Sequence, residues 1–227
     1  MTAWACSAIL FDLDGVLVDS RRCIEAIWRA WAAEKGLDPD PFLRIAHGRR
    51  ISETIRTVAP ELDVAAEVRT LDRMEETATA GIAPVAGAAE LLGAIPRERW
   101  AIVTSGSRRV ATLRLGIVGL PVPRVFIPAD AVARGKPSPD GYLAAAAQLG
   151  IAPGECVVVE DSPPGVAAAR AAGMRVVALL TTHAAADLEH ADIRLPALAG
   201  LRVLHGPVES AALSLQWTPG GSAGPRA

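Results

Sequence analysis

The stretch that decides the fold is SAILFDLDGVLVDS, residues 7–20. A continuous apolar run leads into Asp12 and Asp14, and Gly15 follows directly. This pattern predicts a strand that is buried on both faces and carries its polar residues at the carboxyl end. Two carboxylates at positions i and i+2 of an extended backbone point the same way, so they can share one cation and one substrate. Gly15 allows the chain to turn sharply after the strand.

The same design recurs along the chain, where apolar runs that end in polar residues alternate with helical stretches. The predicted strands are 7–12, 100–104, 156–159 and 175–180, with a weaker one at 125–127. The predicted helices are about 87–95, 108–116, 138–149 and 164–172. This alternation predicts an α/β fold with a doubly wound, Rossmann-like parallel sheet. In such sheets ligands bind beyond the carboxyl ends of the strands.

One long interval breaks the alternation, because apolar residues recur there at helical spacing without a convincing strand. We expect an α-helical cap inserted between the first strand and the rest of the core. The predicted domains are an α/β core of residues 1–16 and 83–217, a helical cap of residues 17–82, and a tail of residues 218–227. The tail is rich in Pro, Gly and Ser, so we expect it to be disordered.

Composition excludes several kinds of partner. The 227 residues carry a formal net charge of −2, and 51% of them are hydrophobic, which is typical of a well-packed protein without a general attraction to nucleic acid or membrane. The three cysteines are odd in number and form no C-x-x-C pair, so we expect reduced thiols. The first residues lack the basic region of a signal peptide, and no apolar run approaches the roughly 18 residues of a membrane span. We expect a cytoplasmic protein; no sequence pattern defines its oligomeric state.

Three further polar groups follow the first strand in order. Thr104 begins the sequence TSG at the end of the strand 100–104, Lys136 lies in GKPSPD, and Glu160-Asp161 follows the strand 156–159. Each alone is typical of a turn, a surface lysine or a strand-end loop, but four such groups at successive strand ends indicate one site. Beside Mg²⁺, a carboxylate can attack phosphorus and form an aspartyl-phosphate. A second carboxylate can protonate the leaving alkoxide and later deprotonate water.

The sequence DLDGVLVDS resembles the first motif of the haloacid dehalogenase-like superfamily, specifically its phosphatases with a helical cap. The three later groups match the family's other motifs in order, over about residues 7–200. The resemblance implies an all-oxygen Mg²⁺ site, which suits that ion, and a small phosphorylated metabolite as the partner. It implies catalytic roles for Asp12, Asp14, Thr104 and Lys136, phosphate binding by Thr104, Ser105 and Gly106, and metal binding by Asp12, Asp14, Glu160 and Asp161.

The predicted cap carries one further motif. The stretch AHGRRIS, residues 46–52, resembles the H-G-x-R stretch in the caps of sugar- and polyol-phosphate phosphatases. The resemblance implies that His47, Gly48 and Arg50 approach the substrate, and a basic loop that faces the solvent is the alternative. Trp28 and Trp31 are expected in the core of the cap.

These patterns favour an Mg²⁺-dependent phosphatase that hydrolyses a small phosphorylated sugar or polyol through an aspartyl-phosphate. The alternatives are a sugar phosphomutase similar to beta-phosphoglucomutase, a phosphoglycolate-type phosphatase, and a binding protein without catalysis. Mutases of the family carry a histidine in the first cap helix, whereas the matching stretch 21–26 has none. Asp14 argues against a dehalogenase, and Lys35, the one lysine of the predicted cap, lies in a charged stretch that does not suit a phosphonatase.

Overall fold

A six-stranded sheet forms the centre of the molecule. The computed structural model describes residues 2–205 and 213–217, so the predicted tail lies outside the described residues. The strand order is β6-β5-β2-β7-β8-β9, and all five pairings are parallel. The six strands are β2 (Ala8–Phe11), β5 (Trp100–Val103), β6 (Val125–Ile127), β7 (Cys156–Glu160), β8 (Arg175–Leu179) and β9 (Ile193–Leu195). The predicted doubly wound α/β fold is confirmed.

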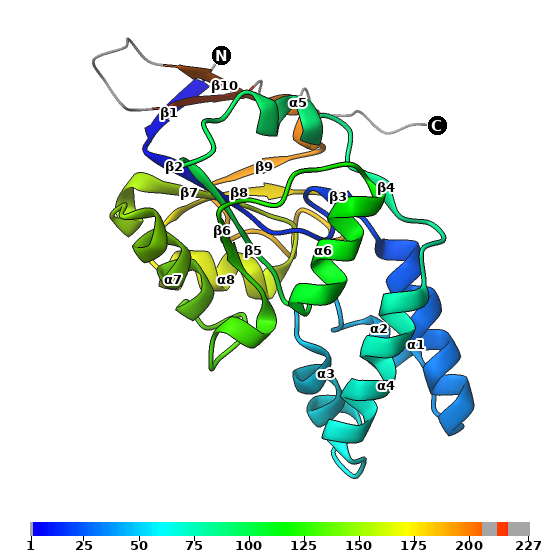
Figure 1. Ribbon diagram of the computed structural model, residues 1–227. Helices are drawn as coiled ribbons and strands as arrows, with labels where there is room; N and C mark the ends of the chain where they lie inside the picture. Colours follow the sequence, from blue (N-terminus) through cyan, green and yellow to red (C-terminus); the bar gives the residue numbers. More distant parts are fainter. Residues whose placement is uncertain (1, 206–212, 218–227) are drawn as a thin grey trace, which may run out of the picture.

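The two faces of the sheet follow from the two-residue period of its strands. Ile9 and Phe11 of β2 belong to one hydrophobic cluster, whereas Ala8 and Leu10 belong to the other. Side chains alternate between faces in this way because successive residues of a strand point in opposite directions. Helices cover both faces (Figure 1). They are α5 (Ala88–Gly93), α6 (Arg108–Ile117), α7 (Asp140–Leu149) and α8 (Pro163–Ala171).

The interval after β2 is helical, as predicted. It contains α1 (Arg21–Lys35), α2 (Asp40–Leu43), α3 (Ile51–Val58) and α4 (Val64–Thr77). These helices have a hydrophobic cluster of their own, in which Trp28 stacks on Phe42 with ring centroids 5.5 Å apart and Trp31 is fully buried. In Figure 1 the four helices form a separate layer at the end of the sheet opposite β1 and β10. We call α1–α4 the cap below; its limits at residues 17 and 82 stay a prediction.

Two short strands join the cap to the core. The strands β3 (Val18–Asp19) and β4 (Ala83–Pro84) pair antiparallel, with Val18 opposite Pro84 and Asp19 opposite Ala83. The prediction that this interval contains no strand is therefore wrong at its first residues. These strands could not be recognised in the sequence, because two residues are too few to show the alternation of apolar and polar residues that is typical of a strand. The pairing brings the entry and exit of the cap together.

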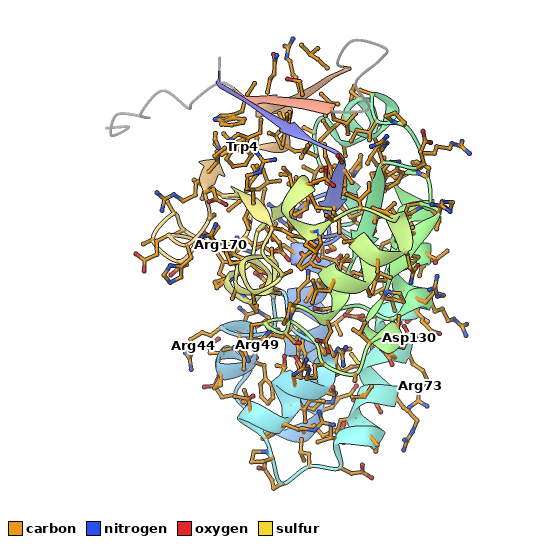
Figure 2. The ribbon with its side chains drawn as sticks, turned by 90° about the vertical axis from the view of Figure 1, so that its left-hand side faces the viewer. Trp4, Arg44, Arg49, Arg73, Asp130 and Arg170 are labelled. Atoms are coloured by element: carbon orange, nitrogen blue, oxygen red, sulfur yellow. The ribbon has the colours of Figure 1, made fainter. Side chains whose placement is uncertain are left out.

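A second sheet was not predicted. It consists of β1 (Thr2–Cys6), β11 (Leu213–Trp217) and β10 (Leu201–His205), paired antiparallel in that order. Leu213, Leu215 and Trp217 alternate with less buried residues and join the hydrophobic cluster that also holds Phe11. In Figure 2 this sheet, which contains Trp4, lies at the opposite end of the molecule from Arg44, Arg49 and Arg73 of the cap. The small sheet thus covers the core far from the cap.

Candidate active site

Three charged side chains meet at the carboxyl end of the central strands. Asp12 follows β2, Glu160 ends β7, and Lys136 comes from the segment before α7. All three are buried, with 4%, 0% and 6% of their surface exposed. The Lys136 ammonium donates to Oδ1 of Asp12 and, over 2.6 Å, to Oε1 of Glu160. The parallel sheet therefore brings the first, third and fourth predicted groups together, as expected for its carboxyl edge.

Glu160 has both carboxylate oxygens engaged. Its Oε1 accepts hydrogen bonds from Lys136 and, over 2.9 Å, from the Tyr142 hydroxyl. Its Oε2 accepts from the backbone N–H groups of Asp161 and Ser162, at 2.8 and 3.1 Å, and from the Ser162 hydroxyl at 3.0 Å. Burial alone would raise the pKa of Glu160, but Lys136 and these N–H donors hold that pKa below its usual value. Glu160 is thus an ionised anchor for Lys136.

Asp161 lies beside Asp12, on the turn that follows β7. Oxygens of Asp12, Glu160 and Asp161 lie within 4.8 Å of one another, and the Thr182 hydroxyl donates to Oδ2 of Asp161. Gly15, with φ of +84°, packs against this carboxylate so closely that a Cβ would lie 1.9 Å from Oδ2 of Asp161. A side chain at position 15 would therefore collide with the carboxylate cluster, which explains why glycine follows the two aspartates.

The charge balance of this cluster fits a divalent cation. Burial, together with the nearby Glu160 and Asp14, raises the pKa of Asp12 to about 7 despite Lys136. Burial and the same crowding raise the pKa of Asp161 well above its usual value. One ammonium thus faces three buried carboxylates, and a second source of positive charge would keep them ionised. Hard oxygen donors are the ligands that Mg²⁺ prefers.

Asp14 points to a different set of partners. Its Oδ1 accepts hydrogen bonds from the Ser20 hydroxyl at 2.6 Å and from Nη1 of Arg114 at 2.9 Å. Arg114 lies on α6, is 2% exposed, and places Nη2 3.4 Å from Oε1 of Glu75 on α4. The Asp14 carboxylate is not among the three that cluster. Its predicted metal-binding and catalytic roles stay predictions.

The segment between β5 and α6 forms the neighbouring wall. Thr104 is 5% exposed, and its Oγ1 accepts a hydrogen bond from the backbone N–H of Gly106 at 3.1 Å. Ser107 caps α6 by accepting from the N–H of Val110 at 3.4 Å. Backbone N–H groups at the start of a helix suit an anion, so the predicted phosphate-binding role of residues 104–106 agrees with their place.

The H-G-x-R loop of the cap contacts the core directly. The carbonyl of Gly48 accepts from the Ser105 hydroxyl at 2.9 Å, and a Cβ at Gly48 would lie 2.2 Å from the Ser162 hydroxyl. Gly48 has φ of +78°, a conformation in which glycine is favoured. Gly48 thus forms a close contact between cap and core, and its predicted approach to the substrate stays a prediction.

His47 and Arg50 flank that glycine in different surroundings. Burial, followed by the neighbouring His183, lowers the pKa of His47, so its imidazole is neutral at pH 7. Arg50 donates from Nη1 and Nη2 to the backbone carbonyls of Ala133 and Val132, at 3.1 and 2.9 Å. Both side chains line the cavity between cap and core, but the Arg50 guanidinium is held by the core loop.

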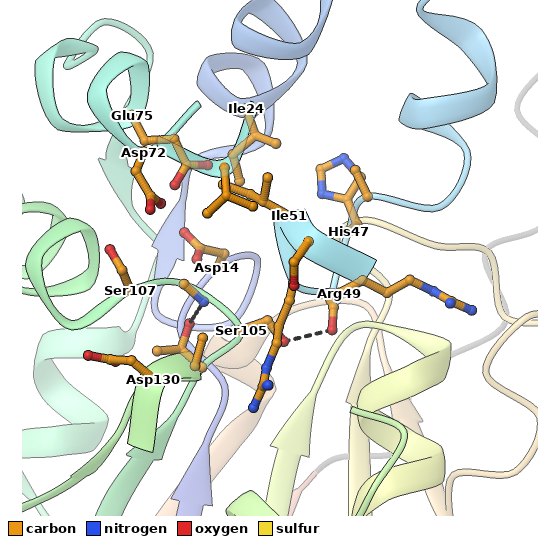
Figure 3. A pocket seen from close by; sticks show the side chains of 18 of the residues that line it. Asp14, Ile24, His47, Arg49, Ile51, Asp72, Glu75, Ser105, Ser107 and Asp130 are labelled. Carbon is orange, nitrogen blue, oxygen red and sulfur yellow. Dashed lines mark hydrogen bonds between the residues drawn. The ribbon is translucent and has the colours of Figure 1, made fainter. Parts of the chain in front are cut away.

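That cavity, seen from close by in Figure 3, has a volume of about 270 Å³, and Asp12 and Asp14 are among the residues that line it. Its core wall contains residues 104–107, and its cap wall contains residues 46–52 and parts of α1 and α4. Figure 3 shows Asp14 near the middle of the view, with Ser105 and Ser107 on the core side and His47 on the cap side. Asp12, Asp14 and Thr104 of the predicted catalytic set thus share one cavity with the predicted cap residues, whereas Lys136 does not line it.

Several residues of the site were missed from the sequence. Arg114 lies in the middle of α6 and Tyr142 lies on α7. The sequence of neither helix indicates a functional role for these residues. Thr182 and His183 follow β8, and the Nδ1 of His183 lies 3.0 Å from the carbonyl oxygen of Asp161. Their position just beyond a strand's carboxyl end was the available signal, whereas Arg114 and Tyr142 had none.

The fold and the site together define a class of enzyme. The family model described as haloacid dehalogenase-like hydrolase matches residues 6–173, and the chain belongs to this family. The chain is 44% identical over 207 residues to hexitol phosphatase A of Escherichia coli (strain K12), a match that covers 89% of this chain and 96% of that protein.

Two other comparisons agree with that assignment. Glycerol-1-phosphate phosphohydrolase 1 of Saccharomyces cerevisiae is 36% identical over 188 residues, covering 78% of this chain and 75% of that protein. The structure of CbbY from Rhodobacter sphaeroides in complex with phosphate matches with a TM-score of 0.74 and 25% identity, covering 86% and 95% of the two chains. The predicted class, a phosphoric monoester hydrolase of the haloacid dehalogenase-like family, is confirmed.

Proposed function

We propose that this enzyme removes phosphate from a small phosphorylated sugar or polyol, with Asp12 as the nucleophile. The observation that carries the proposal is that Asp12, Asp14 and Thr104 line one cavity beneath the cap, while the buried Lys136 donates a hydrogen bond to Asp12. The phosphatase relatives named above act, by their names, on phosphorylated hexitols and on glycerol 1-phosphate. An uncharged alcohol with several hydroxyl groups is therefore the proposed leaving group.

In the first step an Asp12 oxygen attacks phosphorus, and the bond between phosphorus and the substrate's ester oxygen breaks. Lys136, whose pKa the two carboxylates raise despite its burial, stays protonated and balances charge on Asp12 and the phosphoryl group. The hydroxyl of Thr104 and the N–H groups that follow it would hold the phosphoryl oxygens. The product of this step is an aspartyl-phosphate on the chain.

Asp14 is the proposed acid and base. It would give a proton to the departing alkoxide and then take one from the water that attacks the aspartyl-phosphate, which releases inorganic phosphate and regenerates Asp12. Its place on the cavity wall next to Asp12 supports this role. Arg114 and Ser20, which hold the carboxylate in the structure, would position it.

Asp12 and Asp161 are the residues that would hold Mg²⁺. The ion would offset negative charge among the carboxylates and on the phosphoryl group. Glu160, whose two oxygens already accept five hydrogen bonds, would act instead by orienting Lys136. The sequence predicted four metal-binding residues, Asp12, Asp14, Glu160 and Asp161. We propose Asp12 and Asp161 as the ligands; metal binding by Asp14 stays a prediction from the sequence.

The phosphomutase alternative has less support. The first cap helix, α1, begins with Arg21-Arg22-Cys23 and holds no histidine over its whole length. The histidine nearest to the site on the cap is His47, which lies on the loop before α3. Nothing in the described cap resembles the mutase feature, so hydrolysis is favoured over return of the phosphoryl group to a sugar.

Replacing Asp12 by Asn tests the proposal. Release of inorganic phosphate from sorbitol 6-phosphate and from p-nitrophenyl phosphate, each with Mg²⁺, should fall by at least about 10³-fold, because an amide is a poor nucleophile. Asp14→Asn should reduce the rate of hydrolysis of sorbitol 6-phosphate more than that of p-nitrophenyl phosphate, because the good leaving group of the aryl phosphate needs little protonation. Activity of Asp12→Asn within tenfold of the wild type would remove Asp12 from the nucleophile role.

A further inference from the structure

The cavity has an acidic side that the proposed chemistry does not use. Asp72 and Glu75 extend into it from α4, and Asp130 reaches it from the short helical turn Ala129–Ala131 of the core. Figure 3 shows Asp72 and Glu75 above Asp14, with their carboxylates directed into the cavity. Cap and core therefore both place negative charge along the same part of the wall.

Glu75 lines the cavity and accepts no hydrogen bond from any described residue. It is 8% exposed, and its one ionic partner among the described residues is Arg114, at 3.4 Å. Burial raises the pKa of Glu75 although Arg114 opposes that rise. Within residues 2–205 and 213–217, Nη2 of Arg114 likewise makes no hydrogen bond. A nearly buried carboxylate with free acceptor capacity at a cavity wall is suited to a donor from a ligand.

Asp72, one turn before Glu75, is half-buried. Over the described ranges 2–205 and 213–217 it forms neither a hydrogen bond nor an ion pair. Burial is the main reason that its pKa is raised, and the nearby carboxylates of Glu76 and Asp130 add to that rise. No hydrogen-bond donor among the described residues therefore explains why a charged residue such as Asp72 lies at this wall of the cavity.

The cations of the cavity lie on its other side. Arg49 and Arg50 come from the H-G-x-R loop, as does the neutral His47, and Arg50 is already bonded to two core carbonyls. In the proposed function, Lys136 and the N–H groups after Thr104 would hold the phosphate. The acidic side is then left for the part of the substrate that carries no phosphate.

We infer that Asp72, Glu75 and Asp130 form the subsite for the alcohol part of the substrate, where they accept hydrogen bonds from its hydroxyl groups and reject substrates with a carboxylate. Carboxylates accept hydrogen bonds from hydroxyls strongly, whereas a second carboxylate placed beside them is repelled in a partly dehydrated site. The inference rests on the proposed function and makes it narrower. It selects polyol and sugar phosphates and excludes the phosphoglycolate-type alternative.

A matched pair of substrates isolates this effect. Sorbitol 6-phosphate and 6-phosphogluconate share their six-carbon chain and phosphate and differ at carbon 1, which is a hydroxymethyl group in one and a carboxylate in the other. We expect wild-type kcat/KM to favour sorbitol 6-phosphate by about 100-fold or more. Asp72→Asn keeps a hydrogen-bond acceptor and removes the charge, so this preference should fall at least about tenfold.

Two controls make the result specific. Glu61→Gln removes one negative charge from an exposed cap position outside the cavity, and it should leave the preference unchanged. Asp72→Asn should unfold at the wild-type temperature or above, because Asp72 has no hydrogen-bond or ionic partner to lose among the described residues. Glu75→Gln is avoided as the main variant, since it also disturbs Arg114.

Binding gives a readout that does not need turnover. Calorimetry on the Asp12→Asn variant should show tighter binding of sorbitol 6-phosphate than of 6-phosphogluconate, and the added Asp72→Asn substitution should reduce the difference. Equal binding and equal kcat/KM ratios in the presence and absence of Asp72 would overturn the inference. If neither sorbitol 6-phosphate nor p-nitrophenyl phosphate is hydrolysed, the proposed function fails, and the calorimetric preference still decides for or against the acidic subsite.

Discussion

Arg114 joins the core to the cap through the part-buried carboxylate of Asp14 and the buried carboxylate of Glu75, so its removal should be costly. Its guanidinium, 2% exposed, lies 2.9 Å from Asp14 and 3.4 Å from Glu75. At an effective dielectric constant near 20 each attraction amounts to about 5 kcal/mol before the cost of burial is subtracted. Breaking a buried pair by removing one partner costs about 3–5 kcal/mol. We expect Arg114→Met to lower the free energy of unfolding by that amount at pH 7.

The assay is urea unfolding of wild type and variant at several pH values. Burial already raises the pKa of Glu75 in the wild type, and without Arg114 that pKa should rise further. The folded variant then binds more protons than the unfolded chain, so its stability falls as pH rises above the usual pKa of a glutamate and through the raised pKa of Glu75. The gap between wild type and Arg114→Met should therefore widen with pH, and adding Glu75→Gln should close part of it.

Arg109 provides a matched control on the same helix. Its Nε lies 3.1 Å from Glu76, but its side chain is 78% exposed, and exposed ion pairs contribute about 0–1 kcal/mol. Arg109→Met should therefore have a small effect. A loss below about 1 kcal/mol for Arg114→Met, or a loss equal to that of Arg109→Met at every pH, would refute the reasoning.

Two further predictions concern the cap. Glu67 accepts hydrogen bonds from Lys35 at 2.6 Å and from Trp31 at 2.8 Å, and the Lys35 bond is the main reason that its pKa is lowered. Glu67→Gln should thus lower the free energy of unfolding, measured with urea, by about 1.5–3 kcal/mol at pH 7. The difference from the wild type should vanish as pH falls through the lowered pKa of Glu67. A loss of stability that persists at pH 2 would contradict this prediction. Gly48→Ala should reduce kcat/KM for sorbitol 6-phosphate by about 10²-fold, because the new Cβ would displace the cap loop from Ser162. Gly36→Ala, at φ of +68° with nothing within 4 Å, is its control, and equal losses of activity would show that the contact is unimportant.

The sequence predicted the central sheet well because its strands are buried on both faces. Runs such as residues 156–159 are apolar throughout and end in charged residues, so both the strand and its active end are visible. The small sheet was missed although Leu213, Leu215 and Trp217 alternate with polar residues. Its strands β1 and β11 pair although they lie near opposite ends of the chain, and such a pairing leaves no local signal.

The site was predictable in its residue types but not in their directions. Motif spacing placed Asp12 and Lys136 in one site, and the sheet brings them into contact. No spacing could show that Asp14 pairs with Arg114, 100 residues further along the chain, because an arginine in an amphipathic helix is ordinarily expected in solvent. The hydrogen bonds from Arg50 to the carbonyls of residues 132 and 133 could not be predicted either. The sequence shows which residues can donate hydrogen bonds, but the acceptors depend on the three-dimensional fold.

The small sheet has a consequence for the order in which the protein can be completed on the ribosome. Its middle strand is β11, so β1 and β10 have no partner in it until residues 213–217 have been synthesised. Until then β1 presents an unpaired edge, and the face of the core that Leu213, Leu215 and Trp217 cover is open. A nascent chain that stops before residue 213 would contain all strands of the six-stranded sheet but would lack β11 of the small sheet. The apolar surface that β11 covers would then be exposed to chaperones and proteases.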